Sequence, residues 1–599
     1  MAKTLDGKKV NVDLIIRELK HNGRYNIVQL IILSLNMLSQ PANILSILFI
    51  GMKPDFQCRA YDNSTILPIE IQELMSSSSN NNATWLEYSQ CSVNVMSSNG
   101  PTNSTILSLP CTNGYIYERP KSNSFISEWD LVCGKRAFGA LSQTILVIGM
   151  TVGAFVIPYF ADRCGRRPII IFCQAAIWVC SFAVVFIPSL VPFLVLRFFI
   201  GCFEQGYSIP TATLALEIFP TERRAFISMI RGVNWSLSCL VLGMSGYLMR
   251  SYNWRYFALL VSFTATVFII DFLFLKESLR WLFVNNRLDR AKEIIRHATK
   301  MNKIEFDPIW HKHVEIAGEE CVRCDILNDK TTTIPLMSSN NDKDSELDKS
   351  SSINSLFTIE PPPITIENTT EYNVTPEEPL SSKDNPSSLT LFTDPALRSI
   401  MLIQIYCWAI NSMSYYGIYL AVTSLSGNKY FNFLVTAACE LVTMSSVWKA
   451  FMWFGRKKAL IGYLLIGSLS QFAAIFINLY IDKNSKYIFL EIVASTLGMF
   501  GVSGAFSAIW GYLPELIPTN YRNSAVGFSS CAARVGSAVS PFTLLVVSII
   551  PWVPPAVFSG GLFLAGVLVL LLPETRGRQM PQCIDDVRAW SCKKKSEDQ

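Results

Sequence analysis

The chain has 599 residues, of which 50% are hydrophobic and only 16% are charged, and its formal net charge is +5 at pH 7. A soluble domain contains roughly 25% charged residues, so a soluble fold could not cover this much apolar surface, and a membrane protein is indicated. The small net charge gives no reason to expect a nucleic-acid partner, and the lack of a G-x-x-x-x-G-K-[ST] motif argues against ATP-driven pumping.

Apolar stretches long enough to cross a bilayer of about 30 Å occur about twelve times along the chain. The first follows a polar, mixed-charge segment over residues 1–25 and is too long for a signal peptide, so it is interpreted as a retained span. The predicted fold is an all-α membrane protein with twelve transmembrane helices. The expected spans are 26–52, 136–160, 168–187, 191–215, 225–249, 255–275, 398–422, 431–453, 459–481, 487–512, 523–549 and 555–573.

Lysine and arginine residues indicate how these spans are oriented. They gather in alternate loops, whereas the short loops near 188 and 551 contain none. By the positive-inside rule the basic loops and both termini, including the tail 574–599, are cytoplasmic, and the plasma membrane is the expected location. The basic residues on this side are Arg163, Arg166, Arg167, Arg223, Arg224, Arg280, Arg287, Arg290, Lys292, Arg456, Lys457, Lys458, Arg522 and the lysines at 593–595.

The long loop over residues 53–135 then lies outside the cell. It contains four cysteines and three N-x-[ST] sequons, a combination that suits an oxidising compartment. We expect two disulfides, with all three connectivities open, and glycans on the sequons. The cysteines are Cys58, Cys91, Cys111 and Cys133, and the sequon asparagines are Asn63, Asn82 and Asn103.

Residues 276–394 form a cytoplasmic loop with two parts. The segment from Arg280 to about His313 has helical periodicity, whereas 325–394 is rich in Ser, Asn, Asp, Glu and Pro and is predicted to be a disordered linker. The sequons at Asn368 and Asn373 fall in this linker, so they should stay unmodified.

Chemistry-bearing motifs are scarce. The chain has no GxSxG or HExxH motif, so neither an enzyme nor a cofactor is predicted. The spacing of the possible zinc ligands matches no structural zinc pattern, so no metal site is predicted. Those ligands are His311, His313, Cys321 and Cys324; the other histidines, His21 and His297, also lie outside the spans.

Three short motifs occur twice, roughly 290 to 300 residues apart. The corner Glu217-Ile-Phe-Pro-Thr221 returns as Glu515-Leu-Ile-Pro-Thr519, Gly165-Arg166-Arg167 as Gly455-Arg456-Lys457, and Glu277-Ser-Leu-Arg280 as Glu574-Thr-Arg576. Self-similarity at a fixed offset in a hydrophobic chain is typical of a transporter with two repeats. We therefore predict two six-helix bundles, over 26–275 and 395–573.

The repeated charges all fall at cytoplasmic ends of spans. A glycine permits the sharp turn between two helices, and the surrounding acids and bases can hold the two halves together on the inner side in one state and release them in another. The simpler alternative is a set of ordinary interfacial charges. The predicted gate residues are Asp162, Arg163, Gly165, Arg166, Arg167, Glu217, Arg223, Glu277, Arg280, Arg456, Lys457, Glu515, Arg522 and Glu574.

These motifs resemble a known family. DRCGRRP (162–168), the two E-x-x-P-T corners, KESLRWL (276–282) and LLPETRG (571–577) are similar to the major facilitator superfamily. EWDLVC (128–133), YYGIYL (415–420), SGNKYFNF (426–433) and SSCAARVGSAVSPF (529–542) resemble its organic cation, anion and zwitterion (carnitine) transporters. The resemblance covers nearly the whole chain apart from the 325–394 linker.

The sequence departs from the family pattern at three places. Pro158 replaces the glycine that usually opens the first turn motif, and ESPRWL has become ESLRWL. In the second copy of the turn, Met452 and Trp453 stand where Asp-Arg is usual. We therefore expect a weaker gate in the second half, because an acidic partner for a helix terminus is missing there.

Two ionisable residues lie deep within spans. A charge at mid-bilayer costs about 2.5–3.5 kcal/mol on insertion scales, so Glu440 and Arg534 are expected to face a wet cavity. The alternative is a Glu440–Arg534 pair that only braces the bundle. Arg197 and Arg231 lie closer to span ends, where a structural role is favoured.

The resemblance adds aromatic residues to the predicted binding site. Trp408, Tyr415 and Phe506 match the central cavity of the family, with Tyr416 beside them, and their rings could hold an organic cation by cation–π attraction. In this family cation carriers resemble each other in having an acid where Arg534 stands, and anion and zwitterion carriers have an arginine there. With Glu440 also present, a carnitine-like zwitterion is the favoured substrate, with sodium or a proton as a possible coupling ion.

Two other functions compete with this one. A sugar transporter of the same superfamily would have a glutamine pair before Asn411, where this chain has Ile405 and Tyr406. A transporter-like receptor could use the linker for phosphorylation, and uptake into vesicles that contain only this protein separates a receptor from a carrier.

Overall fold

A computed structural model of the chain describes residues 2–3, 9–10, 12–20, 23–52, 54–61, 68–77, 84–99, 102–220, 224–312, 390–422, 427–480, 489–518, 521–547, 549–577, 581 and 584–597. Several predicted features lie outside these described residues. They are Arg223, Asn63, Asn82, Asn368, Asn373, His21, His313, Cys321, Cys324 and the 325–394 linker as far as residue 389.

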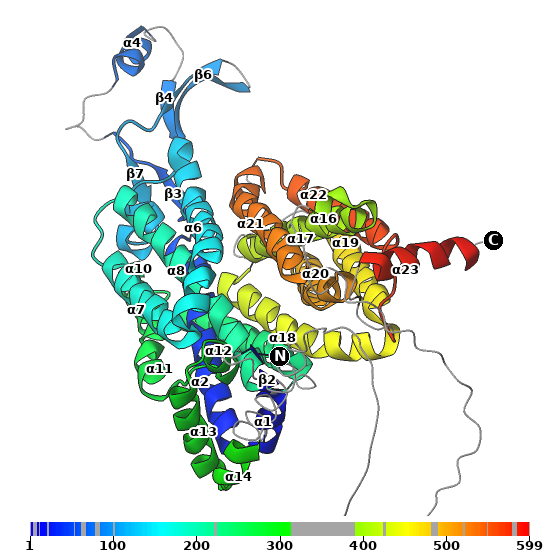
Figure 1. The fold of residues 1–599 in the computed structure, drawn as a ribbon. Coiled ribbons are helices and arrows are strands. Elements are labelled where there is room, and N and C mark those ends of the chain that lie inside the picture. Colours follow the sequence, from blue (N-terminus) through cyan, green and yellow to red (C-terminus); the bar gives the residue numbers. More distant parts are fainter. Residues whose placement is uncertain are drawn as a thin grey trace, which may run out of the picture.

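Six long helices form the first half of the bundle, coloured from blue to green in Figure 1. α2 is extended by a short α3, and α10 continues through η4 into α11, so each of these pairs makes one crossing. The bounds are α2 (Arg24–Leu45), α3 (Ile47–Ile50), α6 (Arg136–Cys164), α7 (Arg166–Val184), α8 (Leu190–Ile218), α9 (Arg224–Leu248), α10 (Trp254–Thr264), η4 (Ala265–Val267) and α11 (Phe268–Phe274).

Six more helices form the second half, coloured from yellow-green to red in Figure 1. They are α17 (Pro395–Val422), α18 (Lys429–Phe454), α19 (Arg456–Tyr480), α20 (Phe489–Leu516), α21 (Arg522–Val547) and α22 (Val553–Val569). The twelve helices coincide with the twelve predicted spans, which confirms the all-α, two-half membrane fold. By length and composition, nine helices in the described part of the chain can cross a membrane, and α22 is a shorter apolar helix.

Close helix packing within each half depends on glycines that lie against a neighbouring backbone. On α6, a Cβ at Gly149 would come within 2.0 Å of the Phe198 carbonyl oxygen, and one at Gly153 within 2.0 Å of the Cys202 carbonyl oxygen. The two glycines are four residues apart, so they share one face of α6 and let it lie directly against α8. Any larger side chain would push the two helices apart.

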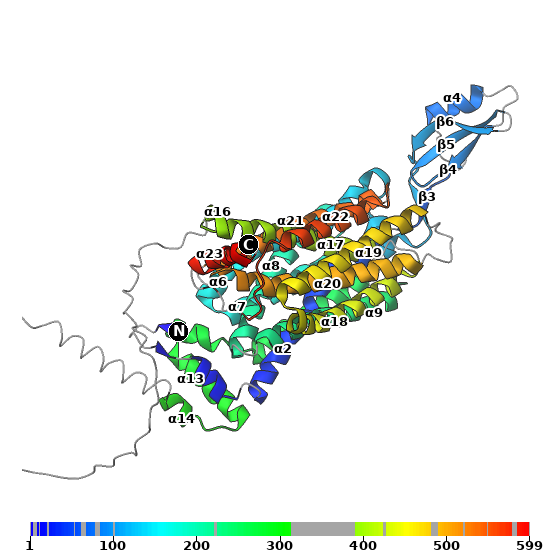
Figure 2. The same ribbon diagram turned by 90° about the vertical axis from the view of Figure 1, so that its right-hand side faces the viewer.

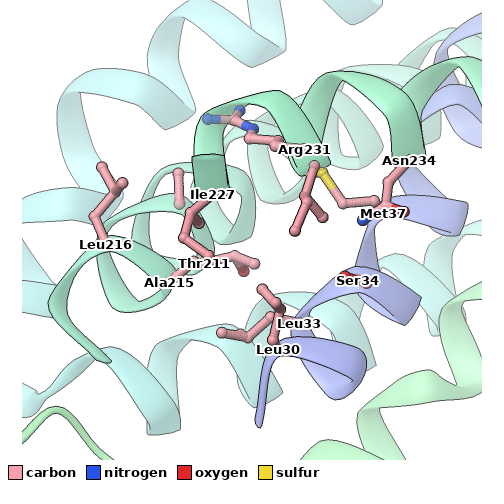
Figure 3. Close-up of a pocket in the computed structure, with 12 residues that line it drawn as sticks. Leu30, Leu33, Ser34, Met37, Thr211, Ala215, Leu216, Ile227, Arg231 and Asn234 are labelled. Atoms are coloured by element: carbon pink, nitrogen blue, oxygen red, sulfur yellow. The ribbon is translucent and has the colours of Figure 1, made fainter. Parts of the chain in front are cut away.

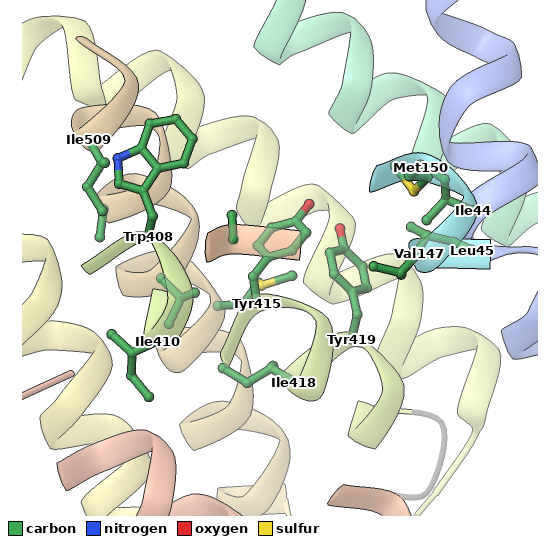
Figure 4. Packing of buried hydrophobic residues seen from close by; sticks show 14 of the residues in the cluster. Ile44, Leu45, Val147, Met150, Trp408, Ile410, Tyr415, Ile418, Tyr419 and Ile509 are labelled. Atoms are coloured by element: carbon green, nitrogen blue, oxygen red, sulfur yellow. The ribbon is translucent and has the colours of Figure 1, made fainter. Parts of the chain in front are cut away.

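The two halves meet along two helix pairs, α6 with α21 and α9 with α18. One large buried cluster runs through both halves. In Figure 4, Val147 and Met150 of α6 lie beside Tyr419 of α17 in this cluster. A polar link accompanies them, since the Thr144 hydroxyl donates to the Ala538 carbonyl oxygen at 3.0 Å.

The described residues between 54 and 135 project from one end of the bundle, which we call the loop end (Figure 2). They contain a two-stranded antiparallel sheet of β3 (Phe56–Cys58) and β7 (Tyr115–Tyr117) and a three-stranded sheet in the order β4 (Thr84–Tyr88), β5 (Ser92–Asn99), β6 (Thr102–Pro110). Four short helices belong to the same region: α4 (Ile69–Ser77), η1 (Lys121–Asn123), α5 (Phe125–Glu128) and η2 (Cys133–Lys135). Sequence analysis did not predict these strands.

The opposite end carries both chain termini and is called the terminal end (Figure 2). There α1 (Val12–Glu18) packs with α12 (Leu279–Val284), α13 (Leu288–Asn302) and α14 (Asp307–Trp310) around a separate core that includes Ile15, Leu282 and Ile295. The predicted helical segment after Arg280 is therefore present. In the second half, α16 (Thr390–Thr393) precedes α17, and α23 (Ile584–Glu597) contacts α17.

Candidate functional site

The acidic residue of the predicted site is enclosed by hydroxyl groups. Glu440 lies near the middle of α18 and is only 1% exposed. Its carboxylate accepts hydrogen bonds from the hydroxyls of Tyr415 (2.7 Å), Tyr419 (2.5 Å) and Ser503 (3.3 Å). The tyrosines are four residues apart, so they share one face of α17, and their hydroxyls point to the same side (Figure 4). Three donors thus satisfy a carboxylate that would otherwise be costly to bury.

The basic residue of the predicted site reaches across the bundle. Arg534 lies on α21, and its Nη2 donates to Oε1 of Gln205 on α8 at 2.8 Å. The same guanidinium also interacts with the Tyr416 hydroxyl. A second bond links the halves, because Nε1 of Trp235 on α9 donates to the Tyr415 hydroxyl at 2.8 Å. Two predicted site residues, Tyr415 and Arg534, therefore form hydrogen bonds between the halves.

The predicted aromatic residues lie together as one cluster. The Tyr415 ring stacks on Phe506 with centroids 5.9 Å apart, and Phe506 lies 6.1 Å from Trp408. Trp510, which sequence analysis missed, is closer still to Trp408, at 4.6 Å. Because Trp510 is four residues after Phe506 on α20, helical periodicity could have identified it.

Glu440 and Arg534 do not bond to each other in the described part of the chain, so the predicted bracing pair is absent from it. The carboxylate is bound by hydroxyls, and the guanidinium is bound by Gln205 and Tyr416. The expectation that Glu440 faces a wet cavity is wrong in this conformation, because Tyr415 and Tyr419 cover its oxygens. Arg534 is partly exposed, and its Nε has no hydrogen-bond partner among the described residues.

A hollow toward the terminal end has a second arginine on its lining. About 470 Å³ of empty space, open solvent included, lies between α2, α8 and α9. Figure 3 shows Leu30 and Leu33 of α2 on one side of this hollow and Arg231 of α9 on the other. Arg231 is exposed, donates to the Ser208 hydroxyl at 3.4 Å and lies close enough to Arg534 for the two charges to repel. A purely structural role, which sequence analysis favoured, does not explain this exposure.

The remaining intramembrane charges of the first half are buried. Arg197 donates to the Asn43 carbonyl oxygen at 3.0 Å and to Gln143 at 2.8 Å, which agrees with the structural role expected for it. Glu204 lies in the middle of α8, fully buried beside Tyr207, and sequence analysis missed it. The rule that singled out Glu440, an ionisable residue far from both helix ends, would have found Glu204 as well.

The turn between α6 and α7 is capped by a carboxylate. Gly165 has φ 107°, and it brings the start of α7 next to Glu277. The Glu277 carboxylate accepts the backbone N–H groups of Arg166 (3.1 Å), Arg167 (3.0 Å) and Ser278 (2.9 Å). A negative charge at the first N–H groups of a helix is favoured by the helix dipole. Burial raises the pKa of Glu277, and these backbone hydrogen bonds partly oppose that rise.

Side chains around this turn form the first gate cluster. Arg166 pairs with Glu217 at 3.3 Å and with Asp162 at 3.3 Å. Arg167 donates to the Phe272 carbonyl oxygen at 2.7 Å. The other predicted members are close by: Arg163 lies over the Tyr159 ring at 4.4 Å, and Arg280 donates to the Glu217 carbonyl oxygen at 3.4 Å.

The turn between α18 and α19 repeats this arrangement. Gly455 has φ 86°, and the Glu574 carboxylate accepts the backbone N–H groups of Arg456 (3.0 Å) and Lys457 (3.2 Å). Arg456 pairs with Glu515 at 3.2 Å, and Lys457 donates to the Leu570 carbonyl oxygen at 2.8 Å. The last predicted member, Arg522, donates to the Ile517 carbonyl oxygen at 3.5 Å.

One expectation about the gate is wrong, and the other, that its charges join the two halves in one state, stays a prediction. The partners given above for Glu217, Glu277, Glu515 and Glu574 all belong to the same half as the carboxylate, so these bonds brace each half rather than join the two. The second half also has an acidic partner for its helix terminus, because Glu574 caps α19. In the family pattern this partner stands at the position of Met452, whereas here the carboxylate comes from Glu574, outside the turn motif.

The loop end contains the predicted cysteine pairs. Cys58 is bonded to Cys111 and Cys91 to Cys133, which selects one of the three connectivities. Asn103 belongs to β6, while the other two sequons lie outside the described residues. In the described part of the chain, no group of three or more His, Cys, Asp or Glu side chains is placed to hold a metal ion.

Comparison with known proteins gives the family. The profile of the Major Facilitator Superfamily matches residues 135–541. The chain is 28% identical over 497 residues to "Solute carrier family 22 member 7" of Rattus norvegicus, covering 83% of this chain and 81% of that protein. It is 25% identical over 548 residues to "Organic cation transporter protein" of Drosophila melanogaster, covering 90% and 87%.

Two solved structures have a similar fold. The crystal structure of a D-xylose-proton symporter matches with a TM-score of 0.54 and 11% identity, covering 93% of this chain and 100% of that chain. The inward open conformation of the xylose transporter XylE from E. coli matches with a TM-score of 0.51 and 13% identity, covering 76% and 89%. At such identity the likeness shows the fold alone.

Proposed function

The chain belongs to the Major Facilitator Superfamily, and from this premise we propose that it carries small organic ions across a membrane by alternating access, with carnitine-like zwitterions as the favoured substrate. One observation carries this proposal. The two central hydrogen bonds between the halves, Trp235–Tyr415 and Gln205–Arg534, both end on residues of the predicted binding site. A substrate that binds Tyr415 and Arg534 would replace these bonds, and its binding would then affect how the halves are held together.

The charges of the site suit an ion with both a carboxylate and a quaternary ammonium group. Arg534 is partly exposed and has an unpartnered Nε among the described residues, so it can bind a carboxylate. The ammonium group would contact the rings of Tyr415 and Phe506 rather than Glu440 itself, because the oxygens of Glu440 already accept tyrosine hydroxyls. Glu440 contributes its negative charge from behind those rings.

A second candidate substrate is an organic anion. Arg231 and Arg534 are near enough to repel each other, and Arg231 is exposed. Two guanidinium groups in one low-dielectric region favour a ligand with more than one negative charge. One relative is named for organic cations and another for organic anions, so the names do not decide the class. Sugar transport is less favoured because the Tyr406 hydroxyl already donates to the Gly561 carbonyl oxygen at 3.2 Å.

We place the terminal end in the cytoplasm and the loop end outside the cell. The basic turns at Arg166–Arg167 and Arg456–Lys457 support this orientation through the positive-inside rule, and the two disulfides of the loop end suit an oxidising exterior. The plasma membrane is the location that fits both features. Transport is either facilitative or coupled to sodium or a proton, and imposed gradients of each ion during uptake would distinguish these cases.

The decisive experiment is uptake by purified protein in vesicles, with labelled carnitine, labelled benzoate and labelled tetraethylammonium. We expect carnitine to be taken up fastest by the wild type. Arg534→Asp should lower carnitine and benzoate uptake about tenfold or more, which corresponds to about 1.4 kcal/mol of lost binding, and should favour tetraethylammonium. If an anion with two charges is the true substrate, labelled phthalate should be taken up faster than benzoate, and Arg231→Gln should lower phthalate uptake more than carnitine uptake.

A matched control variant makes the same arginine-to-aspartate change at a surface position. Arg398→Asp alters an exposed arginine at the terminal end of α17, so the order of the three substrates should not change. If Arg534→Asp also leaves that order unchanged, Arg534 does not select the substrate. If a folded wild-type protein binds carnitine without moving it into vesicles, the transporter proposal fails and a receptor is indicated.

A further inference from the structure

A second hollow lies at the loop end. It contains about 730 Å³ of empty space, open solvent included. Three parts of the protein line it: the loop region with Arg119, the first half with Phe49 and Arg250, and the second half with Lys429 and Tyr430. No residue of the central site lines this hollow.

The charged lining of this hollow is mostly basic. Arg119, Arg250 and Lys429 face a single carboxylate, that of Asp55. Arg119 interacts with the Tyr430 hydroxyl and Arg250 lies over the Tyr247 ring at 4.2 Å, so two of the three cations have aromatic rather than acidic partners. Positive charges gathered around one space attract anions into it.

Other basic residues at the loop end, unlike the three cations of the hollow, form ion pairs with acidic residues. Lys121 pairs with Asp130 at 3.1 Å, and Arg255 pairs with Glu128 at 2.7 Å. Within the described residues, no such ion pair is formed by the three cations of the hollow. Their positive charge is therefore left for a ligand, while the acids nearby are used by other bases.

Aromatic rings form the apolar part of the lining. Phe49 stacks on Tyr430 with centroids 5.9 Å apart, and it also contacts Phe257 at 5.5 Å. All three rings line the hollow. A ligand that fills the space would need an apolar or aromatic body to cover these rings and negative groups to meet the cations.

We propose that this hollow is a second binding site, for aromatic organic dianions such as disulfonates or dicarboxylates. Its cations come from both halves, since Arg250 follows α9 and Lys429 begins α18. This proposal rests on the transport function proposed above, because alternating access separates the two halves at the loop end. The complete site therefore exists only while that end is closed. A dianion bound there from outside stabilises the closed loop end and slows transport without entering the central site.

The binding test uses the purified full-length protein in lipid nanodiscs, with naphthalene-1,5-disulfonate as the probe, at constant ionic strength and measured by calorimetry. The double variant Arg250→Gln/Lys429→Gln should bind the probe about tenfold more weakly than the wild type. Both positions are at the surface or partly exposed, so the fold should tolerate the change, and a melting curve checks this. Lys135→Gln, an exposed lysine of the loop end outside the hollow, is the charge-matched control and should bind normally.

A third variant separates this site from the central one. Arg231→Gln, whose side chain bonds to Ser208 within the first half, should leave binding of the probe unchanged. The proposal is overturned if the wild type does not bind the disulfonate, or if Arg231→Gln weakens binding while the double variant does not. These binding results decide the matter even if the chain transports none of the substrates offered, so failure of this proposal and failure of the proposed function are distinguishable.

Uptake kinetics test the effect on transport. With the probe outside the vesicles, the maximal rate of carnitine uptake should fall about twofold or more while KM stays the same, and the double variant should not respond. A rise in KM with an unchanged maximal rate would mean that the probe competes at the central site, which contradicts the proposal.

Discussion

The turn between α6 and α7 and the turn between α18 and α19 are one backbone design made twice with different side chains. In both, a glycine with positive φ ends one helix, and the next helix begins under a glutamate, Glu277 or Glu574. In both, the first basic residue pairs with the glutamate of an E-x-x-P corner, at 3.3 Å for Arg166 and 3.2 Å for Arg456. The equivalence of the two halves is therefore preserved in the groups that satisfy the backbone.

The differences lie among the side chains around these shared contacts. The first half adds an ion pair between Asp162 and Arg166. The second half has Met452 at the equivalent place and instead bonds the Thr575 hydroxyl to Glu515 at 2.5 Å. In the first half the turn arginine has a second acidic partner. In the second half the corner glutamate accepts an additional hydrogen bond from a hydroxyl. Backbone N–H groups at a helix start need a hydrogen-bond partner, whereas an exposed ion pair adds little stability. The glutamate cap is therefore present in both halves, and the exposed ion pair is present only in the first.

Replacement of the turn glycines should have the largest effect on stability and should show the clearest difference between the two halves of the protein. A Cβ at Gly165 would lie 2.4 Å from a Glu277 carboxylate oxygen, and one at Gly455 would lie 2.9 Å from a Glu574 oxygen. Gly165→Ala therefore combines a strained backbone, about 1–3 kcal/mol, with displacement of the helix cap, and Gly455→Ala has the same strain with a milder clash. We expect Gly165→Ala to lower the melting temperature and the uptake rate more than Gly455→Ala.

Thermal melting of the purified variants measures this difference. Gly560→Ala, in α22, is the control, because a Cβ there meets no atom within 4 Å and should change little. Equal losses from the two turn variants would mean that backbone strain alone decides the cost and that the closer approach of Glu277 is unimportant.

Removal of the capping glutamates should have the next largest effect, and an equal one. Glu277→Ala leaves three backbone N–H groups without their carboxylate, and Glu574→Ala removes the same kind of partner from Arg456, Lys457 and Thr575. We expect each change to cost about 1–3 kcal/mol in stability, measured by thermal melting, with uptake reduced in parallel. Glutamine at either place should recover part of the loss, because its carbonyl oxygen still accepts hydrogen bonds. A loss confined to one half would disprove the equivalence.

The twelve helices could be predicted from the sequence because a long apolar run has few alternatives in a bilayer. The span expected at 431–453, for example, is α18, Lys429–Phe454. The strands of the loop end were missed because the apolar alternation there is short: Val93 and Val95 alternate with polar residues in β5, but Ser- and Asn-rich segments surround them. The repeat showed which residues are equivalent, but equivalence does not name partners, so the contacts of the gate within each half could not be predicted.

In the central site, too, the charged residues could be predicted from the sequence but their partners could not. Glu440 and Arg534 were found because ionisable residues deep in a span are rare. Their partners were not found, since Trp235 and Gln205 come from the other half of the chain and no local pattern relates them to Tyr415 or Arg534. The cover that tyrosines give to Glu440 could have been anticipated from the four-residue spacing on α17, once that helix was known to face α18.

The smallest effect should come from moving the extra acid of the first turn into the second. The Asp162 side chain is 75% exposed, so its pair with Arg166 contributes about 0.3–0.5 kcal/mol, and Asp162→Asn should lose only that amount. Met452 lies four residues before Arg456 and is 58% exposed, so Met452→Asp should create the same pair and stabilise the protein by a similar amount at low salt. Met452→Asn, which lacks the charge, should not, and high salt should remove the gain. If Met452→Asp instead destabilises the protein, the negative end of α18 repels the new carboxylate more strongly than Arg456 attracts it, and the methionine is then the better residue for this turn.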